Sequence, residues 1–202
     1  MRLTNHPSQA LSAAWSPNGR NIAFARSADA EDSGVFLTSP LGGTEEKVAA
    51  KKNPIHFLAN ELSWSADSRR LALVDHTTSS ESWNSFLLFE ISLDSLQRTP
   101  IQTNCNLVVA PAFSPRGDYL AWACVDSFSS ISVNVQRLKD GRVTQLLRQP
   151  NAIDGIAWST DGGRIVFSSE GQFGSLWEID LNHSNILGRV PVGHDAITTA
   201  HE

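Results

Sequence analysis

The residues that most often carry out chemistry in proteins are few and scattered in this sequence. Zinc and related metals need imidazoles, thiolates or carboxylates at short ligand spacings, as in HExxH or CxxC pairs. Neither pair occurs, and the histidines are spread along the chain at His6, His56, His76, His183, His194 and His201. The sequence therefore predicts no metal site and no bound cofactor.

Serine chemistry has no recognisable site either. Nucleophilic attack by serine needs a sharp turn that exposes the hydroxyl, of the form Gly-x-Ser-x-Gly, with a histidine and an acid to orient it. No segment of that form occurs. We therefore expect a protein that is not an enzyme and has no catalytic residues.

The two cysteines, Cys105 and Cys124, are too few for a disulfide framework. If they lie on one hairpin whose turn falls near 116–117, Cys124 faces about residue 109 rather than residue 105. We therefore expect two free thiols, which is compatible with a reducing compartment.

Composition and charge limit the classes of molecule that this protein is expected to bind. The 202 residues are 41% hydrophobic and 18% charged, which is typical of a soluble globular protein with a sizeable core. The formal net charge is -5, and basic runs such as Lys51 with Lys52 stop at two residues. Phosphate neutralisation requires a basic excess, so we expect no direct binding of nucleic acid.

One sequence pattern recurs four times and dominates the chain. An aromatic residue and a serine are followed by turn residues in the segments 14–19, 63–68, 112–117 and 157–162. The aromatic residues, at positions 15, 64, 113 and 158, lie 49, 49 and 45 residues apart. Proline, asparagine, aspartate and glycine favour tight turns. Each segment is therefore expected to contain the turn of a β-hairpin.

Short apolar runs after each turn indicate buried strands. Such runs are too short for helices and are bounded by turn residues. Second strands are expected at 21–25, 70–74, 119–123 and 164–167, and third strands at 35–37, 86–89, 131–135 and 176–179. A fourth strand is expected at positions such as 143–147. Four strands per unit at this period predict a β-propeller.

A family resemblance rests on the same residues. Residues 15–24 read Trp-Ser-Pro-Asn-Gly-Arg-Asn-Ile-Ala-Phe, which resembles the WSPDGxxIAF signature of the WD40-like (PD40) repeats of bacterial TolB. Residues 153–169 are similar to repeats of propellers attached to CadC-like winged-helix regulators. The resemblance covers most of the chain. The departures from the signature are Ala66 and Thr160 in place of proline and Ser68 in place of glycine.

The expected fold is all-β: a β-propeller with four four-stranded antiparallel blades in a partial or open ring. The single array 1–202 is expected to contain units at 8–52, 53–103, 104–149 and 150–195. The opening segment 2–7 and the closing segment 188–192 each resemble a fourth strand, so the chain holds a spare outer strand. Three arrangements follow: a homodimer of two arcs that completes an eight-bladed ring, a segment of a longer polypeptide, or a curved monomer with polar ends.

Localisation depends on the same alternatives. No stretch approaches the roughly 20 apolar residues that cross a bilayer, and residues 1–7 lack the apolar region of a signal peptide. We expect no membrane insertion. A complete chain is expected in the cytoplasm, whereas a fragment of a TolB-like or CadC-like protein is expected in the periplasm.

The loops between second and third strands are the longest and most polar, at 27–33, 76–83, 126–130 and 170–174. In a propeller they share one face, and aromatic side chains dominate contact energies at interfaces. The predicted partner-contact residues of this face are Glu31, Asp32, Glu81, Trp83, Asp126, Phe128, Glu170 and Phe173. The mixture suits a basic, partly apolar partner. The alternative is a solvated acidic rim whose aromatic side chains pack onto the blades.

The aromatic anchors hold one position in every repeat, and we therefore expect them to pack between blades rather than to form a ligand cage. They are Trp15, Trp64, Phe113 and Trp158.

The resemblance implies a non-catalytic interaction or sensing module that presents a loop face or a central channel to a protein or peptide. The rival interpretation is a small-molecule or carbohydrate-binding propeller enzyme whose channel site forms on ring completion. Similar propellers precede the hydrolase domain of prolyl-oligopeptidase-like enzymes, and this sequence has no such domain.

Overall fold

The computed structural model describes residues 2–4, 6–28, 31–51, 61–76, 86–105, 107–127, 130–149, 152–169, 175–181 and 185–190. Every regular element in these residues is a β-strand, and they contain no helix that could span a membrane. In chain order the strands are β1 (Gln9–Trp15), β2 (Ile22–Ser27), β3 (Gly34–Thr38), β4 (Glu46–Ala50), β5 (Leu62–Trp64), β6 (Arg70–His76), β7 (Phe86–Ser92), β8 (Arg98–Pro100), β9 (Leu107–Phe113), β10 (Tyr119–Ser127), β11 (Ser130–Arg137), β12 (Val143–Gln149), β13 (Ile153–Trp158), β14 (Arg164–Ser169), β15 (Ser175–Asp180) and β16 (Asn185–Val190).

The strands form four antiparallel units in chain order, namely β1–β4, β5–β8, β9–β12 and β13–β16. The predicted second strands are confirmed as β2, β6, β10 and β14, and the predicted third strands as β3, β7, β11 and β15. The hydrophobic pattern predicted these strands because each is short, apolar and bounded by turn residues.

The units do not form four separate sheets, which differs from the expected four blades. The first and fourth units are four-stranded sheets, but the second and third share one eight-stranded sheet. The link is a single parallel pair, Phe86 with Leu107. Beyond β8 the chain continues along β7, because the Ile101 amide donates to the Leu88 carbonyl oxygen at 2.8 Å. A turn at Asn104, with φ of 54°, then leads into β9 beside the same strand.

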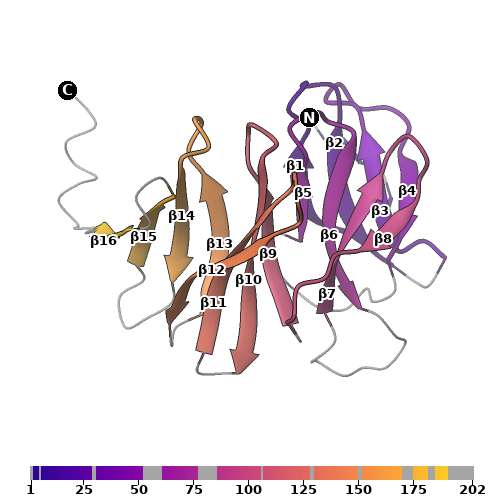
Figure 1. Ribbon diagram of the computed structural model, residues 1–202. Coiled ribbons are helices and arrows are strands. Elements are labelled where there is room, and N and C mark those ends of the chain that lie inside the picture. The colour runs from indigo at the N-terminus through magenta and orange to yellow at the C-terminus, as the bar shows by residue number, and fades with distance from the viewer. Residues whose placement is uncertain are drawn as a thin grey trace, which may run out of the picture.

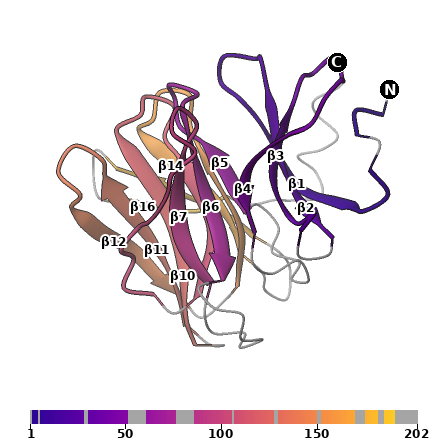
Figure 2. The same ribbon diagram turned by 90° about the vertical axis from the view of Figure 1, so that its right-hand side faces the viewer.

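The sheets stand side by side in a row (Figure 1). The first sheet, in indigo and purple, lies at one end, and β13–β16, in orange and yellow, lie at the other. Strand β1 contacts β5, β5 contacts β9, and β9 contacts β13, so the first strands of the units meet one another. Figure 2 shows the first sheet splayed away from the other two.

The predicted hairpin turns are confirmed and have the expected chemistry. In the fourth, the Ser159 hydroxyl donates to the Asp161 carboxylate at 2.5 Å, and Gly162 has φ of 68°. Glycine adopts that left-handed conformation at no steric cost. In the second turn Ser68 takes φ of 59°, and its hydroxyl accepts a hydrogen bond from the Asn18 amide of the first turn at 3.1 Å. This bond holds the non-glycine turn in place.

Neighbouring units pack through two unlike faces. One face of each unit, which we term the small face, carries small residues on the second strand, as Ala23 and Ala25 do in β2. The next unit meets it with its large face, where Leu71 and Leu73 of β6 are fully buried. The same contact recurs at the next two interfaces. The small face of the second unit (Ala72, Val74) meets the large face of the third (Leu120, Trp122). The small face of the third unit (Ala121, Ala123) meets the large face of the fourth (Ile165, Phe167). This apolar burial is the main stabilising contribution to the fold.

The aromatic anchors join each unit to the one before it. The indole Nε1–H of Trp64 donates to the Ala14 carbonyl oxygen at 2.9 Å, and that of Trp158 donates to the Ala112 carbonyl oxygen at 2.9 Å. Trp64 and Phe113 are 6% and 7% exposed. The prediction that the anchors pack between units is therefore confirmed for the later units.

For Trp15 that prediction is wrong, since its side chain is 61% exposed. Each anchor packs against the small face of the preceding unit, and no described unit precedes β1–β4. The repeat position alone could not show that the first anchor lacks its packing surface.

The expectation of free thiols is also wrong, because Cys105 and Cys124 form a disulfide with their Cα atoms 5.6 Å apart. Strand β9 begins at Leu107, so Cys105 lies outside the hairpin whose register we used. The turn at Asn104 lets the chain approach β10 from beyond the strand end. Hairpin register alone could not show a bond made from that position.

The opening segment does not form the expected spare strand. Its described residues, 2–4 and 6–7, lie outside every strand. Pro7 has no backbone N–H to donate to a ladder, and the Ser8 amide donates to Nδ1 of His6 at 3.2 Å instead. The closing segment does contain the end of a fourth strand, β16, and its last two residues lie outside the described residues.

Candidate functional site

The predicted partner-contact face is described only in part. Glu31 and Asp32 lie in the turn between β2 and β3, and Asp126 lies near the end of β10; all three are exposed. The remaining predicted contact residues lie outside the described residues, and they are Glu81, Trp83, Phe128, Glu170 and Phe173. The structure therefore places three acidic residues of this face and none of its aromatic residues.

The described acidic residues of this face have basic residues nearby. Nε2 of His6 lies 3.7 Å from the Asp32 carboxylate, and Arg148 forms an ion pair with Asp126. The Glu31 carbonyl oxygen accepts a hydrogen bond from the Lys47 ammonium. Of the three described carboxylates of this face, that of Asp126 therefore has its negative charge paired with an arginine.

Two buried ion pairs lie at the same end of the molecule, between the first and second units. Nζ of Lys51 is 2.8 Å from the Glu61 carboxylate, and these side chains are 4% and 1% exposed. Nη1 of Arg98 is 2.7 Å from the buried Asp75 carboxylate and 3.1 Å from the Ala50 carbonyl oxygen of the first unit. Each charge faces an opposite charge, so the four side chains link the two units.

Within the part of the chain that the structure describes, no group of three or more histidine, cysteine, aspartate or glutamate side chains is placed to hold a metal ion. For the rest of the chain, the absence of a metal site stays a prediction.

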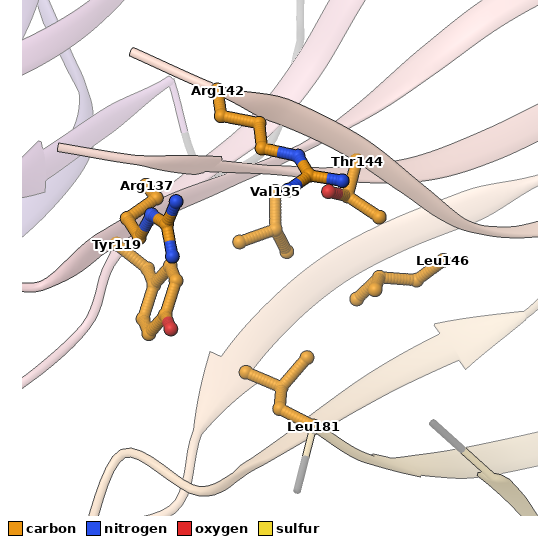
Figure 3. A pocket seen from close by; sticks show the side chains of 7 residues that line it. All are labelled: Tyr119, Val135, Arg137, Arg142, Thr144, Leu146 and Leu181. Atoms are coloured by element: carbon orange, nitrogen blue, oxygen red, sulfur yellow. The ribbon is translucent and has the colours of Figure 1, made fainter. Parts of the chain in front are cut away.

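An open hollow lies between the third and fourth units, with a volume of about 190 Å³. We term it the outer hollow, and it is lined by Tyr119, Val135, Arg137, Arg142, Thr144, Leu146 and Leu181. Figure 3 shows the two arginines along one side of it and Leu181 on the other. The outer hollow therefore combines cationic groups with an apolar surface.

Local structure explains how these side chains come together. Arg137 ends β11 and Arg142 immediately precedes β12, so the turn between those strands brings both guanidinium groups to one rim. Tyr119 begins β10, and its ring stacks on Trp158 of the fourth unit with the ring centroids 6.0 Å apart. Leu181 follows β15 and closes the opposite side.

The two arginines differ in their electrostatic surroundings. Nε of Arg137 donates to the Asp140 carboxylate at 3.1 Å, and this bond raises the pKa of Arg137. The same bond, together with one from the Arg142 backbone amide, lowers the pKa of Asp140. Among the described residues, no carboxylate lies within ion-pair distance of the Arg142 guanidinium. Arg142 is therefore the cation of the outer hollow that remains available to a ligand.

Sequence reasoning did not find the outer hollow. Its residues come from three strands and two turns, and no single strand shows their spacing. The only local signal is the run 137–142, Arg-Leu-Lys-Asp-Gly-Arg, in which basic residues flank a turn.

Antiparallel four-stranded units with a recurrent anchor define the class of the fold as a β-propeller. No protein-family model matches the chain. Among solved structures, it is similar to a TolB from Agrobacterium tumefaciens, with 13% identity and a TM-score of 0.67 over 93% of this chain and 82% of that one. It is also similar to dipeptidyl peptidase 4 from Porphyromonas gingivalis, with 16% identity and a TM-score of 0.61 over 95% of this chain and 34% of that one. The fold is therefore that of a TolB-like β-propeller.

Proposed function

We propose that this chain is a non-catalytic protein-interaction module and that the outer hollow binds a peptide segment of its partner. The segment carries a carboxylate next to an apolar side chain. The observation that carries this proposal is the unpaired Arg142 guanidinium beside the apolar lining formed by Val135, Leu146 and Leu181.

The chemistry of the outer hollow supports this class of ligand. A guanidinium presents several N–H donors in one plane and binds a carboxylate through two parallel hydrogen bonds. Tyr119 and Thr144 add hydroxyl groups to the lining, which can make further polar contacts. The apolar residues would bury an aliphatic or aromatic side chain next to the bound carboxylate, which adds hydrophobic stabilisation.

The loop face remains a second proposed contact surface of the same module. Its exposed residues Glu31, Asp32 and Asp126 are placed on the described turns and strand ends. We propose that, with the aromatic residues predicted nearby, they contact a basic and partly apolar partner surface.

The proposal extends to the organisation of the chain. We propose that the four units, at 8–52, 53–103, 104–149 and 150–195, form one array and that a second copy completes a ring. An enzyme with a small-molecule or carbohydrate site in a channel is not favoured, because the outer hollow, with its arginines and apolar walls, lies at an interface between units.

Binding of labelled peptides tests the proposed function. A peptide set with aspartate or glutamate next to leucine or phenylalanine is compared by fluorescence anisotropy with the same peptides carrying lysine. We expect a preference for the acidic peptides and a loss of about 10-fold or more in affinity for Arg142→Ala, because a charged hydrogen bond is removed. Arg20→Ala, at an exposed turn of the first unit, is the matched control. Equal binding by both variants would refute the assignment.

A further inference from the structure

Among the described residues, the two ends of the row differ in what they expose. The first unit covers its own large face, because Phe24 is buried and the Arg26 guanidinium, which pairs with Glu45, lies over the buried Phe36 ring, but it leaves the anchor Trp15 exposed. Inside the molecule, each small face is covered by the large face of the following unit. The fourth unit leaves a small face uncovered, and its side chains Val166, Ser168 and Leu176 line an open groove of about 360 Å³. Leu176 is 40% exposed and Trp15, at the other end of the row, is 61% exposed.

The internal interfaces define which atoms meet across such a contact. The anchor tryptophan donates to the carbonyl oxygen of the residue just before the preceding anchor, as Trp64 does to Ala14. Ala14 pairs with Ala23 on the second strand of its unit. In the fourth unit the residue in this position is Ala157, which pairs with Val166 and lines the open groove.

A second contact occurs at the same place in the second and third units. The first residue of the second strand lies over the anchor ring of the following unit: Arg70 has its Cζ atom 5.7 Å from the Phe113 ring centroid, and Tyr119 stacks on Trp158. Glu90 holds Arg70 in this position with an ion pair of 3.1 Å.

The fourth unit repeats that arrangement without a ring to receive it. Arg164 begins β14, and Glu178 holds it at 3.2 Å, with the Arg164 side chain 48% exposed. An arginine over a tryptophan face is attracted by the ring quadrupole. The free end of the fourth unit thus carries a carbonyl acceptor, a positioned cation and an apolar groove for one tryptophan.

We propose that Trp15 of a second copy of this chain occupies that groove. Its indole Nε1–H donates to the Ala157 carbonyl oxygen, its ring lies beneath the Arg164 guanidinium, and its apolar surface covers Val166. Two copies joined in this way at both ends form a closed ring of eight units.

The occupant is a second copy because the complementary residues are present on one chain but in different end units of the row (Figure 1): Trp15 ends β1 of the first unit, and Arg164 begins β14 of the fourth. Trp15 and Arg164 therefore meet only between molecules. The contact joins unlike surfaces, so it is heterologous, and it closes into a ring only when the rotation per unit allows. The inference rests on the proposed interaction module and specifies how its second copy binds.

Solution mass measured by light scattering over a dilution series is the first test. We expect a species of twice 22.0 kDa. We expect Trp15→Ala to raise its dissociation constant by about 30-fold or more, because a central tryptophan is a typical interface hot spot. Leu41→Ala, at an exposed leucine outside both faces, is the control and leaves the mass unchanged. A monomer at all concentrations, or a mass that grows without limit, would overturn the closed two-copy ring.

A mixing experiment distinguishes this contact from a symmetric one. The ring of two copies contains two Trp15–groove contacts. Trp15→Ala keeps the groove but has no tryptophan to insert, and Arg164→Glu keeps the tryptophan but has an altered groove. Neither variant alone can therefore form a complete contact. Their mixture restores one complete contact, and we expect a heterodimer from two monomeric proteins. If mixing restores nothing while both variants keep the wild-type circular dichroism spectrum, the head-to-tail contact is wrong.

Cross-linking tests the geometry. Cβ of Ala66 in the second unit lies 3.5 Å from a Cβ built on Gly117 of the third, which is within disulfide range. The equivalent positions across two copies are Thr160 and Gly19. We expect Thr160→Cys with Gly19→Cys to give a covalent dimer on a non-reducing gel, and a protein that stays monomeric contradicts the proposed contact. Ala66→Cys with Gly117→Cys, which links within one chain, is the positive control.

Peptide binding to the outer hollow separates the two proposals. Trp15→Ala leaves the outer hollow intact, so peptide binding by a monomeric variant supports the interaction module independently of the ring. A dimer that binds no acidic peptide would overturn the peptide site and leave the ring contact standing.

Discussion

The interfaces between units are alike at the hairpin end of the strands and differ at the loop end. At the hairpin end, an anchor such as Trp64 packs against the preceding turn and donates to a carbonyl oxygen, and Trp158 does the same. At the loop end, the first interface is closed by buried ion pairs, whereas at the second the Cys105–Cys124 disulfide packs against the core. A repeated motif therefore sets the packing of the units, and individual side chains set how each interface is completed.

The largest effect is expected at the ion pairs of the first interface. Lys51→Ala removes the buried ammonium that pairs with the Glu61 carboxylate, and we expect a loss of about 3–5 kcal/mol in the free energy of unfolding. Urea denaturation measures it. The exposed pair of Arg69 with Asp94 is the control, because Arg69→Ala is expected to cost at most about 1 kcal/mol. Equal losses in the free energy of unfolding for Lys51→Ala and Arg69→Ala would show that the buried ion pair stabilises the fold no more than the exposed one does.

The disulfide of the second interface is expected to rank next. Replacing both Cys105 and Cys124 with serine opens a loop with a sequence separation of 19, and we expect a loss of about 3 kcal/mol. Denaturation with and without a reductant measures the same quantity. The reductant is expected to destabilise the parent chain and to leave the double variant unchanged; a parent chain that is insensitive to reductant would contradict this.

The hairpin end is expected to show a smaller effect that depends on position. Trp64→Phe removes the hydrogen bond to Ala14 and part of a buried ring, and we expect a loss of about 1–2 kcal/mol. Trp15→Phe, at an exposed anchor, is expected to change stability by less than about 0.5 kcal/mol. Thermal unfolding at a protein concentration where the chain is monomeric makes the comparison. A similar loss at both positions would refute the packing difference between the anchors.

The smallest expected effect is on the pH dependence of stability, through the carboxylate of the fourth hairpin turn. Hydrogen bonds from the Ser159 hydroxyl and the Gly163 amide lower the pKa of Asp161 in the folded chain. Its contribution to stability is therefore fully present above the ordinary carboxyl pKa and is lost as pH falls through the lowered value. Asn18, at the same position of the first turn, does not ionise. Asp161→Asn is expected to reduce the loss of stability in acid, and an unchanged acid profile would show that the turn carboxylate does not contribute.

The hairpin ends could be predicted from the sequence because their chemistry is local and repeated. A serine followed by turn-forming residues, with a glycine in three of the four segments, specifies the turn, and the interval between anchors specifies the unit. The loop ends could not be predicted in this way. Lys51 meets Glu61, and Cys105 meets Cys124, through chain paths that leave the strand register. The outer hollow was missed for the same reason, since Arg142 and Leu181 come from different units.

The pairing of small with large faces also bears on how such chains change length in evolution. Every interface joins the same two kinds of surface in the same direction, so the array has polarity. Duplication of one whole unit within the gene creates a new neighbour contact of the type already present, and deletion of one unit removes a contact without creating a mismatch. Gain or loss of a unit in the interior therefore keeps the contact between small and large faces, whereas the side chains that complete the loop ends, such as Lys51 with Glu61, have to be matched again.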